Sequence, residues 1–162
     1  MTRKDKHAHC GYCGEAYADP AWPRVCAACR ETTWRNPIPV AVLVVPVGDG
    51  VLVIRRNIPP VGRLALPGGF VDHGESWQAA AARELREEAG LTIDPATVRH
   101  ARTTSTPDGA SVLIFGVSPP VSDLGAWSAN GEVLERLVVT EPLELGFGLH
   151  TEVLRAWFAG QL

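Results

Sequence analysis

The chain has 162 residues, of which 46% are hydrophobic and 20% are charged, and these values are ordinary for a soluble globular domain with a small appendage. Its formal net charge of -3 excludes a broad basic surface for nucleic acid or acidic membranes, so a polyanionic ligand would need a few placed cations or bound metal. No segment approaches the roughly 20 consecutive apolar residues that cross a bilayer, and we expect no membrane partner.

The N-terminal segment, residues 1–7, is polar and basic and contains no apolar run followed by a cleavage site. It therefore does not resemble a secretory signal. Without such a signal, the four cysteines of the chain are expected in a reducing compartment, and we predict a cytoplasmic protein.

Those cysteines form two Cys-x-x-Cys pairs, Cys10 with Cys13 and Cys26 with Cys29, separated by twelve residues. A disulfide or redox pair would explain one such pair but hardly two in a short polar segment. Four thiolates at this spacing are typical of a closed structural Zn²⁺ site, which would supply the folding energy that so small a segment lacks. His7 and His9 are alternative ligands, although histidines in a polar terminus are more often solvated.

A zinc ribbon that binds nucleic acid is the sharper alternative for this segment. It carries Arg24, Arg30 and Arg35 among several aromatic residues. The positive charge is too dispersed to favour that function, so we do not expect a nucleic-acid partner. The prolines of Trp34–Pro39 then predict an extended linker, which divides a ribbon and linker over residues 1–36 from a main domain over residues 37–162.

The main domain opens with an almost continuous β-branched run, Val40–Val47, which predicts a buried strand. Gly48–Gly50 supplies turn chemistry, and Val51–Arg56 is the expected second strand of a hairpin. Leu64–Leu66 is a short apolar piece, and a turn is expected at Gly68 and Gly69.

The clearest helix is Ser76–Ala89, with Ser76 as its N-terminal cap and Gly90 in a position that favours a left-handed C-terminal cap. Downstream, Val98–Thr106 and Ser111–Val117 flank a turn and predict a second hairpin. Glu132–Val139 is expected to be a strand, and Thr151–Ala159 a closing helix. Strands and hairpins interleaved with two helices indicate an α/β domain with a mixed sheet.

The predicted helix carries Glu84, Glu87 and Glu88, whose spacing places all three carboxylates on one side. Like charges at this spacing repel one another, and a hard divalent cation would turn the repulsion into coordination. A solvated acidic face, with Arg83 and Glu87 as an ordinary ion pair, is the plainer interpretation. The preceding glycines change the balance, because exposed backbone near a helix start can meet metal or phosphate.

The same segment contains a longer pattern, and its fixed residues and gaps resemble the Nudix box at every defined position. The pattern is Gly69, five residues, Glu75, seven residues, Arg83-Glu84-Leu85, one residue, Glu87-Glu88, one residue and Gly90-Leu91. The resemblance implies an α/β/α sandwich with a mixed β-sheet, here preceded by the zinc ribbon.

The resemblance also implies a mechanism, in which Mg²⁺ or Mn²⁺ is bound by Glu84, Glu87 and Glu88 with the carbonyl group of Gly68. Glu75 and Arg83 resemble the pair that orders the loop. The metal and a glutamate would activate water for attack on a diphosphate. The candidate catalytic glutamates are Glu84, Glu87, Glu88, Glu132 and Glu135.

Residues that precede or enter the box are candidates for substrate binding. Arg55, Arg56 and Arg63 could hold phosphate or ribose, and Phe70 could stack on a base. Because Arg55 and Arg56 alternate faces on a strand, at most one of them is expected to point at the site.

A zinc ribbon before such a domain is similar to NADH pyrophosphatases and to related ADP-ribose or FAD hydrolases. The NADH-specific motif Ser-Gln-Pro-Trp-Pro-Phe-Pro is absent from Arg102–Gly109, whereas Pro107 lies sixteen residues beyond Leu91, as a proline does in ADP-ribose pyrophosphatases. We therefore expect a nucleotide-type substrate such as ADP-ribose or a related dinucleotide (FAD or NAD(H)).

Two other functions stay open. One is house-cleaning hydrolysis of nucleoside triphosphates, and the other is a ligand-sensing regulatory module whose ribbon contacts nucleic acid. Such modules often lose box glutamates, which this chain keeps. The resemblance also allows a homodimer, although no segment of the sequence identifies an interface.

Overall fold

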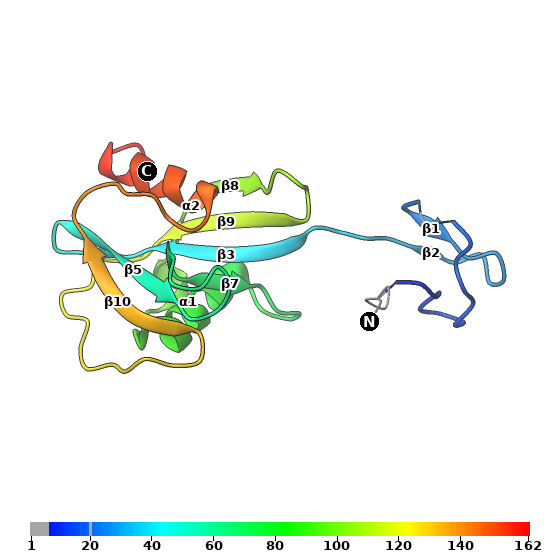
Figure 1. Cartoon of the computed structure of the whole chain (residues 1–162), viewed down its shortest axis with the longest axis horizontal. Coiled ribbons are helices and arrows are strands. Elements are labelled where there is room, and N and C mark those ends of the chain that lie inside the picture. Colours follow the sequence, from blue (N-terminus) through cyan, green and yellow to red (C-terminus); the bar gives the residue numbers. More distant parts are fainter. Residues whose placement is uncertain (1–6, 20) are drawn as a thin grey trace. The chain divides into compact units, whose positions relative to one another are not determined.

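The structure is a computed structural model that describes residues 7–19 and 21–162. Most of the basic segment on which the prediction about secretion depends, residues 1–6, lies outside the described residues. The chain forms two compact units, Met1–Pro37 and Ile38–Leu162 (Figure 1). No helix among the described residues is both long and apolar enough to span a bilayer.

The N-terminal unit consists of two similar turns and a two-stranded antiparallel sheet, β1 (Arg24–Val25) with β2 (Thr32–Thr33). Each turn is closed by one backbone hydrogen bond to the carbonyl oxygen of its first cysteine. The donor is the N–H of Gly14 for Cys10 and the N–H of Arg30 for Cys26. Both of these residues have a left-handed backbone, with φ of 80° and 64°. The two turns therefore have matching geometry.

The larger unit contains two sheets and two α-helices (Figure 1). Its elements in chain order are β3 (Ile38–Val44), β4 (Pro46–Val47), β5 (Gly50–Arg56), β6 (Leu64–Ala65), β7 (Gly68–Phe70), α1 (Trp77–Ala89), the short 3-10 helix η1 (Pro95–Thr97), β8 (Arg99–Ser105), β9 (Ser111–Val117), β10 (Val133–Val139) and α2 (Gly148–Phe158). One sheet has the order β7-β3-β9-β8, and the other has the order β10-β5-β4 with β6 beside β5. The first sheet is mixed, because β3 is parallel to β9 and antiparallel to β7.

Strand β3 lies at the centre of the packing, and its side chains alternate between two cores. Val42 and Val44 belong to a core that includes Leu154 of α2. Ala41 and Leu43 belong to a second core with α1. Helices thus cover both sides of β3, and the predicted α/β/α sandwich with a mixed sheet is confirmed.

The predicted single strand Val40–Val47 is wrong at its end. The strand β3 stops at Val44, and Pro46 and Val47 form β4 in the other sheet, where they pair with Val51 and Gly50. Proline has no N–H for a central ladder, so the chain leaves the first sheet there and continues at an edge of the second. The hairpin partner of β5 is therefore the short strand β4.

The turn predicted at Gly68 and Gly69 is also wrong, because Gly68–Phe70 forms strand β7 against β3. Gly68 has φ of 152°, and a Cβ atom there would lie 2.3 Å from the carbonyl oxygen of Ala41. Glycine thus permits the close approach of two backbones, and this is why the dipeptide forms a strand at this position.

The other predicted elements agree with the structure. Ser76 caps α1 by accepting a hydrogen bond from the N–H of Ala79 at 3.1 Å, and Gly90 has a left-handed φ of 68°. The hairpin β8–β9 and strand β10 lie where they were expected. Helix α2 begins at Gly148, three residues before the predicted start at Thr151, because Phe147 provides no side-chain cap that would mark the boundary.

Candidate active site

The acidic face of α1 borders a cavity of about 860 Å³ that reaches from α1 to α2. Five glutamates line it: four carboxyl groups on the acidic side, Glu84, Glu87 and Glu88 from α1 and Glu132 from the segment before β10, and Glu152 from α2. Apolar side chains of β3, β9 and the start of α2 form much of the remaining wall. One cavity therefore combines carboxylates with an apolar surface.

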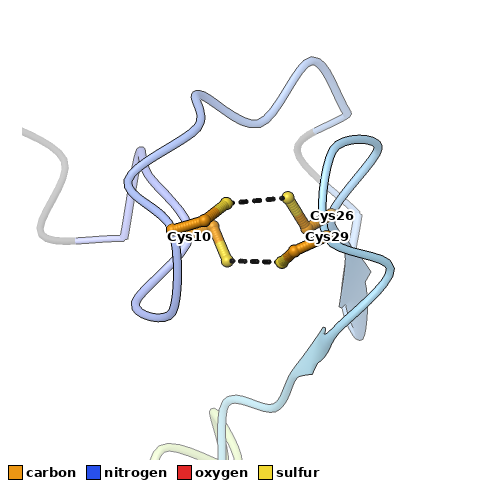
Figure 2. A group of neighbouring side chains, drawn as sticks. Cys10, Cys26 and Cys29 are labelled. Carbon is orange, nitrogen blue, oxygen red and sulfur yellow. Dashed lines mark hydrogen bonds between the residues drawn. The ribbon is translucent and has the colours of Figure 1, made fainter.

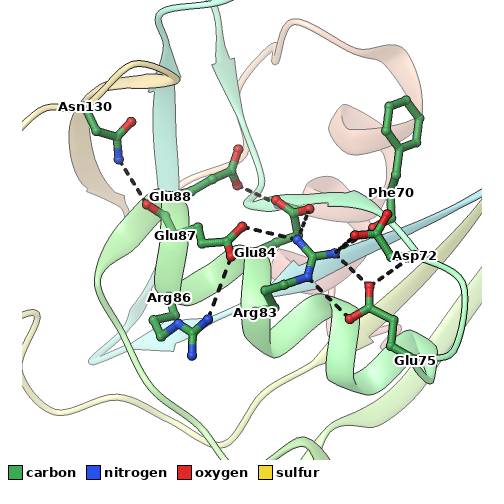
Figure 3. Close-up of polar contacts among 10 residues, drawn as sticks. Phe70, Asp72, Glu75, Arg83, Glu84, Arg86, Glu87, Glu88 and Asn130 are labelled. Carbon is green, nitrogen blue, oxygen red and sulfur yellow. Dashed lines mark hydrogen bonds and ion pairs between the residues drawn. The ribbon is translucent and has the colours of Figure 1, made fainter.

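Arg83 is the centre of the ion-pair network beside this cavity (Figure 3). Its guanidinium group donates to Glu75 at 2.7 Å, to Glu84 at 2.7 Å and to the carbonyl oxygen of Phe70 at 2.9 Å. The hydrogen bonds from Arg83 lower the pKa of Glu75, and its acidic neighbours raise the pKa of Arg83. The predicted loop-ordering residues Glu75 and Arg83 thus meet and join the loop before α1 to the helix.

Glu88 is the most deeply buried of the four carboxyl groups, with 3% of its surface exposed. Burial raises its pKa to about 8, even though the N–H of Gly68 donates to its Oε2 at 2.8 Å. Burial also raises the pKa of Glu84. Removing water from carboxyl groups disfavours their charge, and a neighbouring cation would offset that penalty.

The backbone of β7 leaves room beside Glu84. A Cβ atom on Gly69 would lie 2.3 Å from Oε1 of Glu84, so a larger residue there would displace the Glu84 carboxylate. Oxygen donors, buried negative charge and a glycine-lined edge together fit a hard divalent cation. Glu84, Glu87, Glu88 and Gly68 are the residues that would hold it.

The carboxylates are nevertheless spread apart. Among the described residues, the four cysteines are the group whose ligand atoms come close enough together to hold a metal, and the glutamates do not form such a group. Arg83 contacts Glu84 and Glu87, at 2.7 Å and 3.2 Å, and Gly68 holds Glu88. Glu84 and Glu87 thus share one cationic partner, and Glu88 is held by a backbone amide.

The two candidate catalytic glutamates outside the box, Glu132 and Glu135, lie in different surroundings. Glu132 lines the cavity. Glu135 is opposite Arg55 in the β10–β5 register and forms an ion pair with it, and neither residue is among the described residues that line the cavity. Of these two candidates, Glu132 is therefore the one that lies at the cavity.

Only some of the other predicted substrate-binding residues lie at the cavity. Arg56 lines the cavity with its guanidinium group 5.0 Å from the ring centre of Phe147, whereas Arg63 is absent from the described lining. Phe70 lines the cavity with 58% of its surface exposed, and Figure 3 shows its ring directed away from the carboxylates. Arg56 and Phe70 are thus the predicted contacts that the cavity could offer a substrate.

Asn130 is a functional candidate that the sequence did not reveal. Its Oδ1 accepts hydrogen bonds from the N–H groups of Glu132 and Val133, both at 2.9 Å. Its Nδ2 donates to the carbonyl oxygen of Glu87 at 3.0 Å (Figure 3). In the sequence, an asparagine followed by a glycine before a strand indicates a turn. It does not indicate that the turn is hydrogen-bonded to the acidic helix.

We expect Asn130→Ala to lower kcat by roughly 10- to 100-fold, because Glu132 would lose its fixed position relative to Glu87. Steady-state kinetics would measure this loss, with a smaller change expected in KM. Asp123→Ala is the matched control, since Asp123 bonds the N–H of Gly125 at 2.9 Å in the same loop. Equal kcat values for Asn130→Ala and the wild type would contradict a positioning role.

His150, the third residue of α2, lines the cavity and is 6% exposed. Its Nδ1 accepts a hydrogen bond from the N–H of Leu66 at 3.3 Å. Burial, assisted by the positive charge of Arg56, lowers the pKa of His150 to about 4. The imidazole is therefore neutral at physiological pH, with its proton on Nε2.

This shift predicts that acid destabilises the fold. Between pH 6.5 and 4 the unfolded chain binds a proton at His150 and the folded chain does not, so the unfolding free energy falls by up to about 3 kcal/mol as the pH is lowered. Urea unfolding at several pH values would measure the slope. His150→Gln should lose this contribution, while His100→Gln, which changes an exposed histidine, should keep it.

The N-terminal unit contains a second, separate candidate metal centre (Figure 2). The sulfur atoms of Cys10 and Cys29 are 3.7 Å apart, those of Cys13 and Cys26 are 3.6 Å apart, and all four lie within 4.8 Å of one another. Zn²⁺ bound to four thiolates at about 2.3 Å places neighbouring sulfurs about 3.8 Å apart. All four cysteines are unpaired thiols, so their arrangement fits zinc rather than disulfides.

The backbone prepares the first cysteine of each turn to be a thiolate. Hydrogen bonds from the amides of Cys13 and Tyr12 lower the pKa of Cys10 to about 6. The amides of Cys29 and Ala28 likewise lower the pKa of Cys26. His7 instead contacts the ring of Trp22, and His9 is not part of the ligand group found among residues 7–19 and 21–162.

Comparison with known proteins gives a consistent result for the larger unit. The family model of the NUDIX domain matches residues 37–143. The NAD-capped RNA hydrolase NudC of Edwardsiella ictaluri is 34% identical over 89 residues, and that of Escherichia coli (strain K12 / DH10B) is 33% identical over the same length. In both cases the match covers 54% of this chain and 35% of the relative, so it spans about a third of the curated relatives' length.

Solved structures show the same fold. A NUDIX hydrolase from Nitrosomonas europaea has a TM-score of 0.81 at 22% identity, with 94% of this chain and 91% of that chain covered. The NUDIX domain of Shewanella oneidensis NrtR, solved with ADP ribose, has a TM-score of 0.55 at 21% identity and covers 65% of this chain and 73% of its own.

Proposed function

We propose that this chain, which belongs to the NUDIX family, is a pyrophosphohydrolase that cleaves a nucleoside diphosphate joined to a second group, with ADP-ribose or a related dinucleotide as the substrate class. The observation that carries this proposal is the single cavity in which four carboxylates and an apolar wall meet. Its volume of about 860 Å³ lies in the upper part of the usual range for small-molecule sites, about 300–1,000 Å³.

We assign the cation, Mg²⁺ or Mn²⁺, to Glu84, Glu87, Glu88 and the carbonyl group of Gly68. When bound, such a cation neutralises phosphate charge and lowers the pKa of water. Arg83 keeps Glu84 and Glu87 in place through its ion pairs, at 2.7 Å and 3.2 Å. The backbone amide of Gly68 holds Glu88 in the same way.

Glu132 is our candidate for the general base. It lines the cavity, it is exposed, and its carboxylate forms no ion pair with the described residues. A carboxylate without a cationic partner is available to accept a proton from water. Asn130 would hold the backbone of Glu132 beside Glu87 during this step.

The charge of the cavity favours a diphosphate over a triphosphate. Five glutamates line it, against two arginines, Arg56 and Arg83, and Arg83 is already committed to carboxylates. A triphosphate carries more negative charge than a diphosphate diester and would need more cations near its end. House-cleaning of triphosphates is therefore the weaker candidate.

For the N-terminal unit we propose a structural role for zinc at Cys10, Cys13, Cys26 and Cys29. The unit buries few apolar residues of its own, among them Cys10 and Cys26 themselves. Metal binding would then supply most of its folding free energy.

A substrate panel tests the proposal on the full chain with Mg²⁺ or Mn²⁺. We expect the highest kcat/KM for ADP-ribose, FAD or NADH, with a mononucleotide as one product. Dinucleoside polyphosphates and damaged triphosphates complete the panel. Release of pyrophosphate from triphosphates, without cleavage of the dinucleotides, would overturn the proposed substrate class.

A further inference from the structure

A buried imidazole forms part of the cavity wall on the α2 side. The ring of His150 meets the ring of Phe115 edge-on, with 5.6 Å between their centres, and lies 5.0 Å from the ring centre of Phe147. Leu149, which precedes His150 in α2, and Leu113, which lies in β9 with Phe115, also line the cavity. A polar side chain placed among apolar groups is costly unless its hydrogen-bonding atoms are used.

One of the two ring nitrogens is used within the protein. The N–H of Leu66 can only donate, so Nδ1 of His150, at 3.3 Å, must be the unprotonated acceptor. The proton of the neutral ring is therefore on Nε2. Among residues 7–19 and 21–162, no hydrogen bond to this Nε2–H group is found, and the ring lines the cavity.

We propose that His150 is a specificity-determining residue whose Nε2–H donates a hydrogen bond to a heteroaromatic ring of the substrate, such as a nucleobase. The inference depends on the proposed function only for the position of the diphosphate beside the α1 carboxylates. A second aromatic surface, Phe70 from β7, lines the same cavity.

The surroundings of His150 favour a neutral acceptor over a phosphate group. The imidazole is uncharged and its neighbours Phe115 and Phe147 are apolar. An anion placed there would lose its hydration without gaining a full countercharge, whereas a ring nitrogen or carbonyl oxygen loses little. The nearest cation along the wall, Arg56, lies over the face of Phe147 and bonds the carbonyl oxygen of Pro59 at 2.8 Å.

The first test uses two probes and needs no turnover. In ¹⁵N-labelled full-length protein that retains its zinc and is supplied with Mg²⁺, histidine-selective NMR should show the Nε2-protonated neutral form of His150. AMP should shift the Nε2 resonance of His150, and ribose 5-phosphate, which has the sugar and phosphate but no base, should leave it unchanged. An equal shift with ribose 5-phosphate, or no shift at saturating AMP, would overturn the proposal.

The second test separates binding from chemistry in the intact enzyme. His150→Phe should raise KM for the best substrate of the panel about tenfold and change kcat less than twofold, because one neutral hydrogen bond is lost. His150→Gln, whose amide can accept from Leu66 and donate into the cavity, should recover most of the affinity. An unchanged KM in His150→Phe contradicts the proposal.

These outcomes are independent of the proposed reaction. If the enzyme cleaves none of the dinucleotides but AMP still shifts His150, the proposed function fails and the base-binding subsite stands. If the dinucleotides are cleaved and His150 responds to no base, the reverse holds.

Discussion

Glu88→Gln is expected to reduce kcat for the metal-dependent reaction by roughly 10²- to 10³-fold, a loss typical of a group that stabilises charge in the transition state. Glutamine keeps the shape of the side chain and can still accept from the N–H of Gly68 at 2.8 Å. It removes the negative charge that the cation requires. Initial rates over a range of Mg²⁺ concentrations would measure the effect.

The same substitution should not destabilise the metal-free fold. Because burial raises the pKa of Glu88 to about 8, the free energy of unfolding falls as the pH rises from the ordinary value of glutamate towards 8. Above this range the neutral variant should be the more stable protein without metal. If Glu88→Gln loses activity but melts at no lower a temperature than the wild type, the loss is due to the reaction step and not to unfolding.

Glu152→Gln is the matched control. Glu152 also lines the cavity, but it extends from α2 and pairs with Arg102 at 3.4 Å. An exposed pair of this kind contributes little to stability, and we expect a kcat within about twofold of the wild type. Turnover by Glu88→Gln at a rate similar to that of Glu152→Gln would refute the assigned metal site.

Removal of zinc is expected to unfold the N-terminal unit and leave the larger unit folded. Structural zinc contributes about 10–16 kcal/mol in small domains of this kind, far more than two strands of two residues can supply. Purified protein should contain one zinc per chain by elemental analysis. After chelation, NMR signals of residues around β1 and β2 should collapse to unfolded positions while those of β3 persist.

Cys26→Ser should have the same effect, since serine is a poor ligand and Cys26 is 1% exposed. Asp19→Ala is the control, because Asp19 is exposed in the same unit and accepts a hydrogen bond from the N–H of Ala21 at 2.8 Å. It should retain zinc. A wild-type chain without zinc, or a Cys26→Ser variant that retains it fully, is incompatible with the proposed centre.

Local patterns predicted the helix of the site well. The boundaries of α1 follow from Ser76 and Gly90, and the spacing of Glu84, Glu87 and Glu88 placed them on one cavity. These features depend on neighbours within a few residues, so the sequence contains the necessary information.

Non-local pairing explains what the sequence could not predict. Whether Gly68 and Gly69 turn or pair depends on β3, which lies more than twenty residues earlier in the chain. The choice between Glu132 and Glu135 required the register of β10 against β5. The roles of Asn130 and His150 likewise come from partners far along the chain, Glu87 and Leu66.

Strand β3 has a consequence for attempts to change what this enzyme accepts. Val40 and Val42 line the cavity, while the alternate residues Ala41 and Leu43 pack in the core with α1. A library spread over all of β3 would reshape the pocket through Val40 and Val42 and would also disturb the acidic helix through Ala41 and Leu43. Leu149 and His150 line the same pocket. They belong to α2, which contributes no residue to the core that packs against α1. Selectivity should therefore be evolvable from α2, with the hydrolytic apparatus left unchanged.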